Sequence, residues 1–227
     1  MKDIQPRLED LPEICPVFPL SGAMLLPGGR LPLNIFEPRY LAMTEDALGG
    51  GRMFAMIQPD LDAPTTPHGP GLYRVGCLGR LSSFSETEDG RYLITLNGLI
   101  RFDVAEEIAM QRGYRRVRAD FGRFAVDLDD AAQERPFDRR GLLDALRGYF
   151  QHRGFDADWE AIDAMEGASL VTSLAMVCPF EPLEKQALLE AESLPDRAHT
   201  LRTLLEMDSY EPPRDPDDDA TPRRMAS

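Results

Sequence analysis

Residues 15–43 read CPVFPLSGAMLLPGGRLPLNIFEPRYLAM, and this stretch decides the fold of the chain. Its opening apolar run, residues 16–20, is too short for a helix and is interrupted by prolines, which favours a strand. A second apolar run, residues 24–26, ends at Pro27-Gly28-Gly29, which is a turn signal. Apolar and other residues alternate over 31–36, and this alternation predicts a second strand with a buried face.

The second half of the same stretch changes period at Glu37-Pro38. A proline disfavours helical geometry in the residue before it and suits the first position of a helix. Apolar residues then recur at helical spacing until the glycine run at residues 49–51 stops them. About thirty residues therefore predict a strand, a turn, a second strand and a capped helix.

The run FPL-x-G-x-x-LLPGGRLPLNIFEPRY closely resembles the opening of the amino-terminal, substrate-binding domain of the Lon protease family. The resemblance extends to residues 72–104 and to the segment MVCPFEPLEKQALLEA in residues 176–192, and it spans roughly residues 14–208. It implies an α+β fold, in which a small PUA-like β-barrel or sheet subdomain is followed by a helical bundle. It does not imply proteolysis, because the ATPase and protease domains of a Lon protease have no counterpart in this sequence.

The middle of the chain has a β pattern. Glu88-Asp89-Gly90 predicts a turn. Asn97-Gly98 is the strongest two-residue hairpin signal, so it predicts a second turn between strands at 91–96 and 99–104. A last β stretch, residues 114–126, alternates arginines with apolar residues, which we interpret as a half-exposed strand rather than an RNA-binding stripe.

The carboxyl-terminal third has a helical pattern, with apolar residues at i, i+4, i+7 and i+8. It predicts four helices over about seventy residues, packed as a bundle. A segment with four prolines and an acidic cluster follows, and this composition is typical of disorder. The predicted organisation is a lead-in at 1–13, a β-rich PUA-like subdomain at 14–130, a helical subdomain at 131–208 and a disordered acidic tail at 209–227.

The net charge of −14 argues against nucleic-acid and anionic membrane partners, because both are bound through lysine and arginine. No apolar run is long enough to span a membrane, and the first ten residues lack the apolar core of a signal peptide. Cys15, Cys77 and Cys178 are far apart and without metal-ligand spacing, which predicts buried free thiols in a reducing compartment. We therefore expect a cytoplasmic bacterial protein.

Catalytic patterns were sought and not found. A nucleotide-binding P-loop needs glycines before a lysine, but the two lysines, Lys2 and Lys185, have no such context. Lys185 follows Glu184 on a surface-type helix, which favours its charged form and disfavours a Ser–Lys dyad. His68 lies in the proline-rich loop 59–71, where a solvated side chain is expected. The expectation is a protein with no enzymatic activity, no cofactor and no metal.

The residues expected to contact a bound polypeptide lie in the opening module, residues 15–43, and in the apolar segment that follows it. Methionine suits promiscuous surfaces because it is flexible and polarizable. The alternative is that these apolar side chains form core, that Phe36 and Tyr40 pack the barrel on its helix, and that Arg39 pairs with Glu37. The candidate contact residues are Met24, Leu25, Leu26, Phe36, Arg39, Tyr40, Met53 and Met56.

The sequence thus favours a non-catalytic protein of the Lon substrate-binding-domain type. It would bind exposed hydrophobic segments of unfolded chains or partner proteins, as an adaptor in protein quality control. The alternative is a small-molecule or nucleic-acid binding module that reuses the PUA-like barrel. Neither nucleic acid nor a membrane is an expected partner, and self-association is left open.

Overall fold

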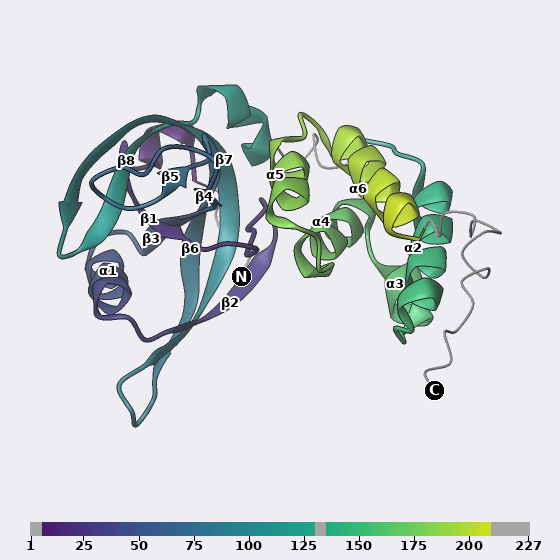
Figure 1. The fold of residues 1–227 in the computed structure, drawn as a ribbon, viewed down its shortest axis with the longest axis horizontal. Coiled ribbons are helices and arrows are strands. Elements are labelled where there is room, and N and C mark those ends of the chain that lie inside the picture. The colour runs from purple at the N-terminus through teal and green to yellow at the C-terminus, as the bar shows by residue number, and fades with distance from the viewer. Residues whose placement is uncertain (1–5, 130–134, 210–227) are drawn as a thin grey trace, which may run out of the picture.

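The structure is a computed structural model that describes residues 6–129 and 135–209. A strand-rich part and a helical part lie side by side along the long axis of the molecule (Figure 1). The predicted lead-in is described from Pro6 onward, and the predicted acidic tail lies outside the described residues except for Ser209. The predicted boundary at 130/131 also lies outside them.

One sheet contains most of the strands, in the order β2-β7-β6-β3-β1-β8, and β7 pairs with β8 as well. Strands β7, β6, β3, β1 and β8 therefore form a closed ring, while β2 is an edge strand that pairs only with β7. The pair β1–β3 is parallel, and the other pairs are antiparallel. The bounds are β1 Ile14–Pro19, β2 Arg30–Ile35, β3 Met53–Ile57, β6 Val75–Glu86, β7 Tyr92–Gln111 and β8 Tyr114–Asp120, with a separate pair β4 Pro59–Asp60 and β5 Gly71–Leu72.

The predicted turn at Asn97-Gly98 is wrong, because both residues lie inside the continuous strand β7. A Cβ atom at Gly98 would lie 2.0 Å from the carbonyl oxygen of Leu26. The glycine is therefore needed where two backbones approach closely, and it does not form a hairpin. The predicted turn at residues 88–90 is correct: Gly90 has a φ of 77° and lies between β6 and β7.

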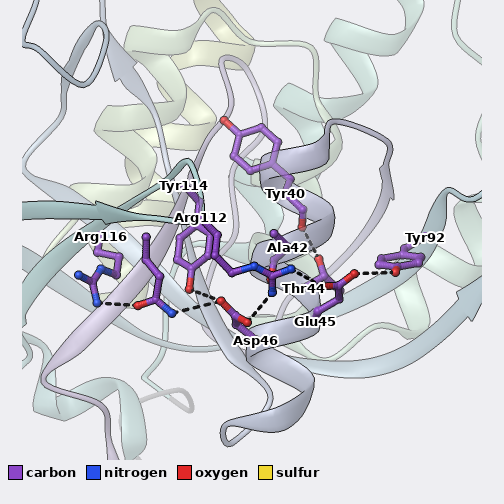
Figure 2. A network of polar contacts seen from close by, with 10 residues as sticks. Tyr40, Ala42, Thr44, Glu45, Asp46, Tyr92, Arg112, Tyr114 and Arg116 are labelled. Carbon is purple, nitrogen blue, oxygen red and sulfur yellow. Dashed lines mark hydrogen bonds and ion pairs between the residues drawn. The ribbon is translucent and has the colours of Figure 1, made fainter.

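Helix α1 (Pro38–Gly49) begins with its proline in the first turn, and Gly51 follows its end with a φ of 81°, as the sequence predicted. Polar contacts hold it to the turn between β7 and β8 (Figure 2). Arg112, in the left-handed region with a φ of 46°, donates to Glu45 and Asp46 at 2.7 Å each. Tyr114 also donates to Asp46, at 2.8 Å. These contacts hold the turn in place. They offset the free-energy cost of placing a residue other than glycine in the left-handed region.

The helical part contains five α-helices between residues 139 and 208, one more than the pattern predicted. Apolar residues keep a helical spacing over 159–177, but this segment forms two helices, which are separated at Met165 and Glu166 by extended backbone. Asp138, Asp158 and Ser193 cap helices by accepting from backbone N–H groups. The bounds are α2 Arg139–Arg153, α3 Trp159–Ala164, α4 Gly167–Val177, α5 Pro182–Glu190 and α6 Leu194–Asp208, and two 3-10 helices are η1 Leu8–Asp10 and η2 Gly122–Leu128.

A continuous apolar core runs through both parts, and the α+β fold with a barrel and a helical bundle is confirmed. All three cysteines are buried and free, as predicted. Burial raises the pKa of Cys15 to about 12 and that of Cys178 to about 11, so neither thiol is activated as a nucleophile. Among the described residues, no helix has both the length and the apolarity needed to cross a membrane.

Candidate functional site

Most of the candidate contact residues lie in the core. The side chains that the structure buries are Met24, Leu25, Leu26, Tyr40 and Met56, each at most 5% exposed. Leu25 and Leu26 pack against Gly79 and Gly98 of the barrel strands, and the ring of Tyr40 lies 4.1 Å from that of Phe18. The alternative interpretation, that these residues form core, is the correct one for these five.

Three candidates remain at the surface. Phe36 is 62% exposed, so it does not pack the barrel on its helix as the alternative interpretation expected. Arg39 is exposed and pairs with Glu37 at 2.8 Å, which that interpretation did predict. Met53 is partly buried. A binding role for these three residues stays a prediction.

Several buried polar residues, none of which the sequence marked as a candidate contact residue, meet at the joint between the barrel and the helices. Arg101 on β7 is 2% exposed and donates to the carbonyl of Leu189, at 3.0 Å, and to that of Ala191, beyond the end of α5. The carbonyls at a helix end have no partner within the helix and carry partial negative charge, which suits a cation. Asp127 on η2 accepts from Nε and Nη2 of the same guanidinium, at 2.9 and 2.7 Å.

Arg197 on α6 is a second buried arginine at this helix end. Its Nε donates to the carbonyl of Leu188 at 2.9 Å, while its Nη2 has no partner among the described residues. Burial, and then the nearby charge of Arg101, lower the pKa of Arg197 to about 10. Two arginines therefore share one helix end, and Asp127 offsets part of their charge.

Lys185 on α5 is buried, and the expected surface position is wrong. Its Nζ donates to the carbonyl of Gly22 in the barrel, at 2.7 Å, and to that of Met176 at the end of α4, at 3.4 Å. Burial lowers the pKa of Lys185. A desolvated lysine is what a Ser–Lys dyad requires, yet this one is occupied by two carbonyls, and no serine is among its described partners.

Two glutamines complete the joint. Gln58, at the end of β3, donates to the carbonyl of Pro182 at 2.9 Å and to the side chain of Gln186 at 3.1 Å. Gln186 donates in turn to the carbonyl of Val75 on β6, at 3.2 Å. Because these bonds are buried and directional, α5 holds the helical part in a defined position against the barrel.

A groove of about 600 Å³ lies beside this joint, between the barrel and α4. The barrel side is formed by the loop before β2 and by the middle of β7, and the helical side by α4. At Gly29 the two sides nearly touch, since an added Cβ would lie 2.3 Å from the Sδ of Met176. The apolar side chains that line the groove are Pro6, Pro27, Leu99, Leu128, Ala168, Met176 and Val177. Val177 is 79% exposed although it is apolar.

Three hydroxyl groups also line the groove, from Ser169, Thr172 and Ser173. Their spacing of i, i+3 and i+4 places them on one side of α4. None of the three side chains makes a hydrogen bond within the described part of the chain. Helical hydroxyls elsewhere in the structure do bond to the carbonyl four residues earlier, as Thr44, Thr200 and Thr203 show. The groove therefore offers free hydrogen-bonding groups next to an apolar wall.

The candidate contact residues do not include the groove residues, although the sequence holds a weak signal for them. Ser169, Thr172 and Ser173 stand out as a hydroxyl-bearing side of an otherwise apolar helix. The barrel side of the groove comes from the loop near Gly29 and from Gly98, some seventy and more residues away in the chain. Only the folded chain brings these segments together. Within the described residues, no group of acidic, histidine or cysteine side chains is arranged to hold a metal ion.

Comparison with known proteins places this geometry in a family. A family model described as the ATP-dependent protease La (LON) substrate-binding domain matches residues 14–207. Lon protease 2 of Sorangium cellulosum is 32% identical over 109 residues, which are 46% of this chain and 13% of that protein. The Lon protease of Flavobacterium johnsoniae is 22% identical over 208 residues, which are 86% of this chain and 24% of that protein. The chain thus spans at most about a quarter of the length of these relatives.

Two solved structures share the fold. The Lon N-terminal domain protein from Xanthomonas campestris has a TM-score of 0.59 at 21% identity, covering 84% of this chain and 97% of that one. The N-terminal domain of the Mycobacterium avium complex Lon protease has a TM-score of 0.56 at 14% identity, covering 85% and 97%. With the family match over residues 14–207, the resemblance seen in the sequence is confirmed, and the chain belongs to the LON substrate-binding domain family.

Proposed function

We propose that this protein binds polypeptides, and that it holds a short apolar segment of them in the groove between the barrel and α4. The observation that carries the proposal is the set of three hydroxyls, which have no hydrogen-bond partner within the described residues, beside an apolar wall. Membership of a substrate-binding domain family supports it.

The chemistry of the groove matches an extended main chain. Each residue of such a chain carries one N–H donor and one C=O acceptor that need partners when they leave water. A serine or threonine hydroxyl can both donate and accept, so Ser169, Thr172 and Ser173 suit either group. Apolar side chains of the same segment would lie on Met176 and Val177. The volume of about 600 Å³ is in the ordinary range of ligand pockets.

The expected affinity of one groove is low. Three buried apolar side chains contribute roughly 1.5–3 kcal/mol each. Lost translational and rotational freedom costs about 4–15 kcal/mol. The gain exceeds the cost by about 5 kcal/mol at most, which corresponds to a dissociation constant no lower than about 0.2 mM. Self-association would raise the apparent affinity through multivalency.

The alternative, a nucleic-acid binding barrel, has less support from the electrostatics. The strand arginines that could form a basic stripe all have partners, and for Arg116 these are the carbonyl of Ala109 and the side-chain amide oxygen of Gln111. Arg115 is held bidentate by Glu107 at 2.6 and 2.8 Å, and Arg118 pairs with Glu13. A small-molecule ligand has no specific observation in its favour.

We further propose that the chain has no catalytic activity of its own and acts as an adaptor in quality control, in the bacterial cytoplasm. The support is the missing P-loop pattern together with the occupied Lys185. The purified chain should neither hydrolyse ATP nor cleave an unfolded casein. Activity that co-purifies with the protein and is lost in Lys185→Ala would contradict this.

Filling the groove tests the binding proposal. Ser173 is exposed, so Ser173→Trp can occupy the groove without disturbing the core. Thr203→Trp, on the exposed side of α6, is the matched control. Reduced, unfolded lactalbumin is titrated into each protein, and amide shifts are followed by NMR. We expect shifts around α4 and residues 27–30 that are lost in Ser173→Trp and kept in the control. Equal binding by the two variants would place the site elsewhere.

A further inference from the structure

One charged side chain at the groove has no charged partner. Arg30, the first residue of β2, is exposed and lines the barrel side of the groove. It makes no ion pair and no side-chain hydrogen bond within the described residues. Among the described residues, the only other ionisable side chain lining the groove is Asp127, and both of its oxygens are engaged by Arg101. As far as the described residues go, the groove therefore presents a single free cation in a chain whose net charge is −14.

The hydroxyls provide an independent sign that the groove is built for a ligand with polar groups. Thr172 lines the groove, and its hydroxyl makes no hydrogen bond within the described residues. Among these residues the only fully buried side-chain polar atom without a partner is Arg197 Nη2, so the Thr172 hydroxyl reaches the groove, where a bound carbonyl or N–H group could take the place of water. Among the described residues that line the groove, no carboxylate is free to receive a basic side chain.

We propose that the groove selects an extended, uncharged polypeptide segment that is flanked by an acidic residue, with Arg30 binding the flanking carboxylate. This inference rests on the proposed function and adds its specificity. The hydroxyls of α4 bond to the main chain of the segment. A guanidinium can hold a carboxylate through two parallel hydrogen bonds, which fixes the register of the segment along the groove. A lysine or arginine at the same position would face Arg30 and be repelled.

Long-range electrostatics acts in the opposite direction, and this makes the inference testable. The net charge of −14 attracts basic peptides to the whole surface. Salt screens such attraction, since the Debye length falls to about 3 Å at 1 M and is about 10 Å at 0.1 M. A direct Arg30–carboxylate contact is screened less. The preference for acidic flanks should therefore emerge as the salt concentration rises.

The probes are three fluorescein-labelled peptides of twelve residues with one shared leucine, valine and serine core. Their flanks are two aspartates, two serines or two lysines. Binding is measured by fluorescence anisotropy in 0.3 M salt, with wild type, Arg30→Glu and Arg74→Glu. Arg74 is also exposed but lines a different cavity, so the control has the same change in net charge.

For wild type we expect the aspartate peptide to bind about two- to fivefold more tightly than the lysine peptide, as for a partly exposed ion pair. Arg30→Glu should reverse this order, and Arg74→Glu should keep it. Equal changes in the two variants would overturn the inference, because the effect would then come from net charge. The serine peptide separates groove binding from the preference for acidic flanks. If Ser173→Trp abolishes binding of the serine peptide, but wild type binds all three peptides equally, only the acidic-flank inference fails. If no peptide binds, the proposed function fails as well.

Discussion

Arg101 and Asp127 form a buried, bidentate ion pair at the joint between the barrel and the helices, with 2% and 4% of their side chains exposed. The same guanidinium caps α5, so the pair links β7, η2 and the helical part. Removing one partner of such a pair leaves a buried charge uncompensated, which costs about 3–5 kcal/mol. The stability of the joint should therefore depend on this one carboxylate.

Asp127→Asn is expected to lower the free energy of unfolding by about 3–5 kcal/mol. The control is Asp103→Asn, whose partner Arg123 lies 3.6 Å away and is half exposed, so that the loss should stay within about 1 kcal/mol. Urea unfolding at pH 7 gives both values. Similar losses in the two variants would mean that the buried pair contributes no more than a surface pair.

Lys185→Met should remove part of the pH dependence of the free energy of unfolding at alkaline pH. Burial lowers the pKa of this lysine, so the folded state disfavours its charged form. Its contribution to stability is therefore greatest above the ordinary lysine pKa of about 10.4 and is lost as the pH falls through the folded-state value. The free energy of unfolding of wild type minus that of Lys185→Met should increase from pH 8 to pH 10.5. A difference that stays flat, measured by urea titration at four pH values, would contradict the burial of a charged lysine.

Asp46→Asn should change how the free energy of unfolding depends on pH in the acid range. A hydrogen bond from Tyr114, and then those from Arg112 and Gln111, lower the pKa of Asp46. The stabilisation by this carboxylate is present above the ordinary aspartate pKa of about 3.9 and is lost as the pH falls through the folded value. Wild type should exceed the variant in stability at pH 6, and the gap should close by about pH 2. Asp144→Asn, whose ion pairs of 3.6 and 3.9 Å are exposed, is the control, and its gap should be small throughout.

Gly98→Ala and Gly148→Ala should change stability in opposite directions. At Gly98 the new Cβ would lie 2.0 Å from a backbone oxygen, so we expect a loss of at least about 1–3 kcal/mol. Gly148 lies exposed inside α2 with no atom near its Cβ position, and alanine there should gain about 0.5–1 kcal/mol. Thermal unfolding of the two variants checks both signs. A tolerated alanine at position 98 would mean that Leu26 does not approach β7 as described.

The sequence predicted well what depends on neighbours along the chain. The proline at the start of α1, the glycines after its end and the turn at residues 88–90 follow from local backbone chemistry. Asn97-Gly98 shows the limit of this reasoning. The dipeptide fits a hairpin equally well, and only the approach of Leu26 reveals why a glycine is required there.

The candidate site could not be predicted in the same way, because its residues come from distant segments. Leu25 and Leu26 read as exposed or buried with equal ease, since the short run that contains them has no period. Lys185 appeared to lie on a surface helix because its neighbours Glu184 and Gln186 are polar, but Lys185 and Gln186 both face the barrel and are buried. At the groove Asp127 is paired with Arg101, whereas Arg30 has no charged partner among the described residues. This difference depends on the folded structure and could not be read from the sequence.

The closure of the barrel sets an order of events during synthesis. Ile14 in β1 pairs with Arg118 in β8, so the first strand has no complete set of neighbours until more than a hundred further residues have been made. A ribosome conceals the last segment it has produced, which delays that pairing further. Strands that wait for distant partners are prone to aggregation in the meantime. During each round of translation the unfinished chain therefore exposes apolar strands that have no partner yet. In this respect it resembles the unfolded polypeptides that we propose as ligands of the folded protein.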